Sequence, residues 1–134
     1  MIFLDANYII NLYVKTNEDH ERAKEIYKLI KNESQVISNL IIIEIITVMT
    51  VKLKQDPTLI LKVHKELKNN YDIVDDTVFH EKGFEVLLNE LKKNKERIPL
   101  FDCVYMALMR ELGIKEIVSF DKHFDNKENI TRIH

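Results

Sequence analysis

Glycine and cysteine are scarce in this chain of 134 residues, and each scarcity excludes familiar kinds of site. The only glycines, Gly83 and Gly113, are too far apart to form a G-x-G-x-x-G turn, a P-loop or a G-x-S-x-G elbow. Cys103 is the only cysteine, which excludes an internal disulfide and any zinc site built on several cysteines. Nucleotide binding and serine-hydrolase catalysis therefore lack their usual machinery.

The chain also lacks long apolar runs and a strong net charge. The run from Leu40 to Ile43 is interrupted by Glu44 and is far shorter than the ~20 residues of a membrane span. No basic leader precedes an apolar run, so we expect a cytoplasmic protein without membrane contact. Because the net charge is only -2, a phosphate-binding surface must be local or must gain positive charge from a metal ion.

What remains is the composition of a folded globular protein. The hydrophobic fraction is 46% and the charged fraction 31%, which argues against a disordered chain. The length suits one core, and neither an internal repeat nor a Pro/Gly/Ser linker divides the sequence. We therefore expect a single domain over residues 1–134.

Hydrophobic spacing predicts helices that alternate with short strands. The helices are expected to begin after Thr16 or Asn17, Ser38, Asp56, Asp75 or Asp76, and near Pro99, the last one ending at Gly113. The strands are expected at residues 2–4, 35–37, 71–74 and 116–118. Parallel neighbours need a crossover helix, so this alternation predicts an α/β sandwich with a mainly parallel sheet.

The segment from Ser38 to Thr50 is ambiguous between strand and helix. Its many isoleucines favour a strand, whereas its length and the capping residue Ser38 favour a helix. We predict a helix that is buried on all sides.

Three acidic residues follow strands or open a helix, where ligands bind in a parallel sheet. Asp5 ends the first strand, Asp121 follows the last strand after Ser119, and Asp102 lies in the first turn of the last helix. A fourth acid, Glu44, sits among isoleucines. Structural roles also account for them: Asp5 can start a turn, Asp102 can complement a helix dipole, and Glu44 can face solvent at one edge.

If these carboxylates converge, their repulsion has chemical consequences. Two charges ~4 Å apart repel by about 4 kcal/mol at an effective dielectric near 20, so the cluster must take up protons or hold a cation. An oxygen-only set without paired histidines selects Mg²⁺ or Mn²⁺ rather than zinc. Such an ion activates water for phosphodiester hydrolysis, and His123, close to Asp121, is then a candidate contact for phosphate or product.

The order of these residues resembles that of a known family. The segments that carry the resemblance are LDAN, an isolated Glu after a short strand and Ser, and FDCVYMALMRELGIKEIVSFDKHF. They are similar to PIN domains, specifically to the VapC-type ribonuclease toxins of prokaryotic toxin-antitoxin pairs, and the similarity spans essentially the entire chain.

The resemblance implies roles for individual residues. Asp5, Glu44, Asp102 and Asp121 match the four acidic positions that bind Mg²⁺ or Mn²⁺ and carry catalysis. Asn7 and Ser119 match supporting polar positions, and Asp125 is either a fifth acid in the outer shell or a turn residue. The implied fold is a three-layer, PIN-like sandwich with a central sheet of four or five short strands. The implied partners are an RNA substrate, a cognate antitoxin and a second copy of the chain.

Three functions remain open at this point. The first is a metal-dependent endoribonuclease, the toxin of a type II pair, that leaves 5′-phosphate and 3′-hydroxyl ends. The second is a catalytically inactive PIN-like module that binds RNA or protein. The third, a phosphatase with Asp5 as nucleophile, ranks last because Asn7 stands where a second acid is normally needed.

A basic run precedes Asp102 and has two interpretations. Its cations are Lys92, Lys93, Lys95 and Arg97. They can follow an RNA backbone, or they can simply form a solvated helix end.

Overall fold

A parallel sheet of five strands lies at the centre of the protein, in a computed structural model that describes all 134 residues. The strands are β1 (Ile2–Leu4), β2 (Gln35–Ser38), β3 (Asp72–Val74), β4 (Glu116–Val118) and β5 (Thr131–Ile133). They are arranged in the order β3-β2-β1-β4-β5, and every neighbouring pair is parallel. The predicted parallel sheet is confirmed.

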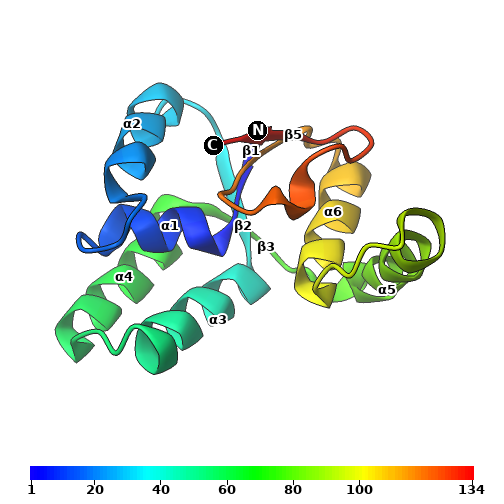
Figure 1. Cartoon of the computed structure of the whole chain (residues 1–134). Helices are drawn as coiled ribbons and strands as arrows, with labels where there is room; N and C mark the ends of the chain where they lie inside the picture. The colour runs from blue at the N-terminus through cyan, green and yellow to red at the C-terminus, as the bar shows by residue number, and fades with distance from the viewer.

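Six α-helices cover the sheet (Figure 1). They are α1 (Ala6–Tyr13), α2 (His20–Ile30), α3 (Asn39–Thr47), α4 (Pro57–Asn70), α5 (His80–Asn89) and α6 (Leu100–Leu112). In Figure 1 the helices α1 to α4 lie on one side of the strands, and α5 and α6 lie on the other. The three-layer, PIN-like sandwich is confirmed. No helix combines the length and the apolar character that a bilayer span requires.

The strand order decides where a ligand of this sheet is expected, at the carboxyl ends of β1 and β4. From β1 the chain winds outward through β2 to β3, then returns across the sheet to add β4 and β5 on the other side of β1. The winding direction therefore reverses between β1 and β4, and ligands of such sheets bind at this reversal. The residues of β1 and β4 nearest this end are buried and apolar, with Phe3, Leu4, Ile117 and Val118 fully covered, whereas Glu116 at the start of β4 is exposed.

The ambiguous segment after Ser38 is a helix, as predicted, but it is not buried on all sides, because Ile43 is 58% exposed, and its capping also differs. Ser38 occupies the N-cap position, but its hydroxyl is buried and makes no hydrogen bond. The acceptor comes instead from Asp76, whose Oδ2 lies 2.9 Å from the backbone nitrogen of Leu40. Asp76 thus caps α3 across space, whereas Asp75 accepts from Thr77 in the turn before α5.

The sequence did not predict α1 or β5, and one predicted helix start is wrong. Helix α1 begins directly after Asp5, and β5 forms an edge strand near the C-terminus. Both are too short for a clear hydrophobic period. Helix α2 is preceded by Asp19 rather than capped by Thr16 or Asn17, because residues 14–20 form successive turns.

Helix α6 is held against α5 by a close approach at Gly83. A Cβ atom added to Gly83 would lie 2.6 Å from Cγ2 of Val104 and 2.8 Å from its Cα. The backbone of α6 therefore leaves no room for a side chain on this face of α5. Asp102 lies on α6, so the close packing of α5 and α6 at Gly83 helps to position Asp102 relative to the sheet.

We predict that Gly83→Ala destabilises the protein by about 1–3 kcal/mol, because α5 and α6 must separate to admit the methyl group. The better helix propensity of alanine offsets at most about 1 kcal/mol of this cost. Chemical denaturation measures the difference. Glu85→Ala on the exposed face of α5 is the matched control, and equal stabilities of the two variants would contradict the packing argument.

Candidate active site

Asp5 and Ser119 stand at the reversal of the sheet, at the carboxyl ends of β1 and β4. Asp5 is buried, and its backbone N–H donates to the carbonyl of Val118 at 3.0 Å, which continues the pairing of the two strands. Its Oδ1 accepts from the N–H of Ala6 at 2.8 Å and so caps α1. The carboxylate is therefore fixed by both a strand and a helix.

Two polar side chains connect the ends of these strands. The hydroxyl of Ser119 donates to Oδ2 of Asp5 at 2.6 Å and accepts from the N–H of Asp121 at 3.0 Å. The amide of Asn7 reaches Ser119 at 3.5 Å, and its Oδ1 accepts from the N–H of Phe120 at 3.1 Å. Asn7 and Ser119 thus link Asp5 to the backbone of the turn after β4.

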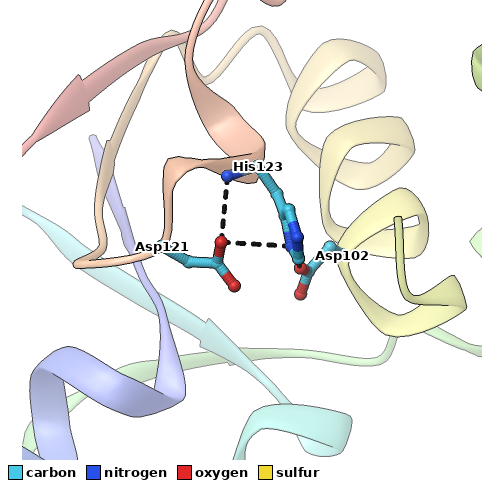
Figure 2. A group of neighbouring side chains, drawn as sticks. All are labelled: Asp102, Asp121 and His123. Carbon is cyan, nitrogen blue, oxygen red and sulfur yellow. Dashed lines mark hydrogen bonds and ion pairs between the residues drawn. The ribbon is translucent and has the colours of Figure 1, made fainter. Parts of the chain in front are cut away.

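Asp102 and Asp121 approach each other with an imidazole between them (Figure 2). Nδ1 of His123 lies 3.0 Å from Oδ2 of Asp102 and 3.1 Å from Oδ1 of Asp121. Donor atoms of these three residues all lie within 4.8 Å of one another. Asp102 comes from the first turn of α6, whereas Asp121 and His123 belong to the turn after β4.

Glu44 joins the cluster from α3, where it is partly buried. The hydroxyl of Tyr105 donates to Oε1 of Glu44 at 2.9 Å. Tyr105 is fully buried and lies one turn after Asp102 on α6. Sequence reasoning did not single out Tyr105. Its spacing from Asp102 was the available signal, because residues three apart lie on neighbouring faces of a helix.

The charges of the four acids act on one another, and among these acids Asp102 and Asp121 bring donor atoms within 4.8 Å of each other. Burial, and then the charge of Asp102, raises the pKa of Asp5 from 3.8 to about 8. Burial raises the pKa of Asp102 to about 6, opposed by the hydrogen bond from His123 and reinforced by the charge of Asp121. The pKa of Glu44 is also raised, mainly by burial and further by the charges of Asp102 and Asp121. Repulsion therefore acts throughout the cluster.

The remaining candidates lie outside this group. Asp125 forms a two-pronged ion pair with Arg132, at 2.6 and 2.9 Å, and Arg132 also donates to the carbonyl of Ser119 at 3.1 Å. Asp125 thus reaches the site only through Arg132, a residue that sequence reasoning missed because β5 was not recognised. Lys92, Lys93, Lys95 and Arg97 are exposed at the end of α5 and in the loop before α6.

The donor set fits a divalent cation. The pKa values of Asp5 and Asp102 are raised, so their charged forms are unfavourable and a bound cation would stabilise them. Carboxylate oxygens are ligands that suit Mg²⁺ or Mn²⁺. Asp5, Glu44, Asp102 and Asp121 are the residues that would hold it.

Comparison with known proteins agrees with this arrangement. A family model described as PIN domain matches residues 2–130. The chain belongs to the PIN domain family. Among curated protein sequences, none matches this PIN domain significantly.

Solved structures share the fold at low sequence identity. VapC20 of Mycobacterium tuberculosis, described as a toxin that cleaves the sarcin-ricin loop, is 18% identical over 91% of each chain, with a TM-score of 0.76. VapBC2 of Rickettsia felis, solved on a DNA fragment from its promoter, is 15% identical over 99% of this chain and 98% of that one, with a TM-score of 0.74. A toxin-antitoxin complex from Klebsiella pneumoniae is 14% identical over 98% and 96% of the two chains, with a TM-score of 0.65.

We predict that, in the presence of EDTA, the free energy of unfolding falls as the pH rises from about 4 to about 8. A carboxyl whose pKa is 3.8 in the unfolded chain and about 8 in the fold stabilises the fold only while it is protonated. Asp5→Asn stays neutral, so the variant should exceed the parent in stability near the upper end of this range by about 1–3 kcal/mol.

Urea denaturation at several pH values measures this difference, with Glu85→Gln on the exposed face of α5 as the control. A variant less stable than the parent at every pH would show that the hydrogen bonds of Asp5 outweigh its charge.

Proposed function

We propose that this PIN domain is a metal-dependent endoribonuclease that hydrolyses RNA phosphodiester bonds with water activated by Mg²⁺ or Mn²⁺. The observation that carries the proposal is the convergence of Asp5, Glu44, Asp102 and Asp121 at the reversal of the sheet. A bound divalent ion activates water, orients the phosphodiester and offsets charge on the attacking and leaving oxygens. It also explains how a chain with a net charge of -2 can accept a phosphate.

The side chains of the protein hold this arrangement. Asp5, Glu44, Asp102 and Asp121 supply the oxygen donors. Ser119 donates a hydrogen bond to Asp5, which also accepts one from the N–H of Ala6, and Tyr105 donates a hydrogen bond to Glu44. The side chain of Asn7 accepts a hydrogen bond from the N–H of Phe120 and so fixes the turn after β4. No side chain of the cluster needs to act as a covalent nucleophile.

We further propose that the protein is the toxin of a type II pair. Structures of toxin-antitoxin complexes with the same fold, from Rickettsia felis, Klebsiella pneumoniae and Neisseria gonorrhoeae, support a cognate antitoxin as the partner. A homodimer in the cytoplasm completes the proposal. Half-exposed apolar residues on α5 and α6, among them Phe84 and Phe101, are compatible with a second copy.

Asp5→Asn and Asp102→Asn are expected to lower RNA cleavage at least about 100-fold, because each removes an oxygen donor and a charge from the ion site. EDTA should abolish cleavage, and added Mg²⁺ or Mn²⁺ should restore it. Gel analysis of a labelled single-stranded RNA gives the rate and the chemistry of the ends. Glu85→Gln is the control and should cleave like the parent.

Cleavage that persists equally in EDTA and in Asp5→Asn would defeat the nuclease proposal. Binding of RNA or of a protein partner without cleavage under any condition would favour the inactive PIN-like module instead.

We expect the basic run to follow the RNA backbone. Reversal of Lys92, Lys93 and Lys95 to glutamate should then weaken RNA binding by about 10-fold or more and reduce its salt dependence, with divalent-ion binding unchanged. Filter binding at several salt concentrations measures this effect. Reversal of the equally exposed Lys62, Lys65 and Lys68 on α4 is the matched control, and equal losses in both triple variants would assign the effect to net charge alone.

A further inference from the structure

The imidazole of His123 occupies a place in the acidic cluster that the PIN fold by itself does not explain. Its Nδ1 lies between two carboxylates that come from different elements, Asp102 of α6 and Asp121 of the turn after β4 (Figure 2). The side chain is about one third exposed, at 34%, whereas that of Asp102 is 9% exposed. His123 and Asp121, whose side chain is 32% exposed, therefore both lie nearer to solvent than Asp102.

The short turn around His123 holds it in this place. The backbone N–H of His123 donates to Oδ1 of Asp121 at 2.9 Å. The next residue, Phe124, is fully buried in the core and anchors the 3₁₀ turn Lys122–Phe124. Since the backbone is fixed on both sides of the imidazole, the ring lies within the site as part of the fold.

The spacing of the donor atoms is that of neighbouring ligands on one ion. Nδ1 of His123 lies 3.0 Å from one aspartate oxygen and 3.1 Å from the other. Two neighbouring ligands of an octahedral ion with bonds of about 2.1 Å are about 3.0 Å apart. The nitrogen is thus spaced from each carboxylate oxygen as two ligands of one ion would be, and the three residues bring donor atoms within 4.8 Å of one another.

We propose that Nδ1 of His123 is a ligand of the divalent ion, together with Asp102 and Asp121, and that it makes the site prefer transition-metal ions over Mg²⁺. The inference rests on the proposed function of the acidic cluster as a metal site. The preference for transition-metal ions follows from the imidazole nitrogen, which is a softer ligand than a carboxylate oxygen. Imidazole suits first-row transition metals, whereas Mg²⁺ prefers oxygen ligands.

A competing role for His123 would have the opposite consequence. As a positively charged partner of Asp102 and Asp121, the imidazole would occupy the place of the cation and oppose the binding of every divalent ion. Removing it would then strengthen the binding of all of them alike. The two roles are therefore distinguished by comparing a transition-metal ion with Mg²⁺.

Calorimetric titration of the full chain with Co²⁺ and with Mg²⁺, at one fixed pH, tests the proposal. His123→Asn should weaken Co²⁺ binding by about 10–100-fold, the effect of losing a metal-site group. Its Mg²⁺ affinity should change by no more than about 3-fold, because the carboxylate oxygens remain. His64→Asn, an exposed histidine on α4, is the matched control and should bind both ions like the parent.

A second measurement gives its main result on the parent protein alone. Pulsed electron paramagnetic resonance of the parent protein with Mn²⁺ should show coupling to a directly bound imidazole nitrogen, and this coupling should be absent in His123→Asn. It also covers the case in which the variant fails to fold.

Each other outcome would overturn the inference. Stronger binding of both ions by His123→Asn would identify His123 as a counter-ion, and unchanged or equally weakened binding would deny it a selective role. A parent protein that binds both ions but shows no nitrogen coupling defeats the inference and leaves the nuclease proposal standing. A parent protein that binds neither ion defeats both.

Discussion

Mutual repulsion among four carboxylates is the constraint on which the active end of this PIN domain depends. The fold brings Asp5, Glu44 and Asp102 into surroundings where burial alone disfavours their charges, and their proximity adds to the cost. Such a cluster is stable only with protons, hydrogen-bond donors or a cation. Ser119 and Tyr105 donate hydrogen bonds to Asp5 and Glu44, and the divalent ion that we propose would offset the remaining charge.

The topology of the sheet holds these mutually repelling carboxylates in fixed positions. Because the winding of the sheet reverses between β1 and β4, Asp5 and Ser119 extend side by side from two buried strand ends. The other acids arrive on helices from opposite faces of the sheet, Glu44 on α3 and Asp102 on α6 (Figure 1). The hydrogen bond between Tyr105 and Glu44 then joins the two layers across the end of the sheet.

Function and stability are opposed at this end of the molecule. Elsewhere the fold obeys ordinary rules: apolar strands, an apolar helix interface at Gly83, and acids such as Asp56 that cap helices at the surface. The cluster departs from these rules because it buries acidic residues near one another. Acidic residues with shifted pKa values are typical of functional sites. The chain belongs to the PIN domain family and shares its fold with the toxin VapC20.

The sequence by itself determined the alternation of strands and helices, the ends of α6 and the candidacy of Asp5, Glu44, Asp102 and Asp121, because each depends on local spacing or on position after a strand. Only the tertiary structure decided which groups meet. Tyr105 and Glu44 are 61 residues apart, and His123 and Asp102 are 21 apart. The cap of α3 by Asp76 bridges 36 residues. Local pattern carries no information on such contacts, since they arise from strand order and helix packing. The short α1 and β5 escaped prediction for a related reason: elements of a few residues draw their stability from neighbours rather than from a period of their own.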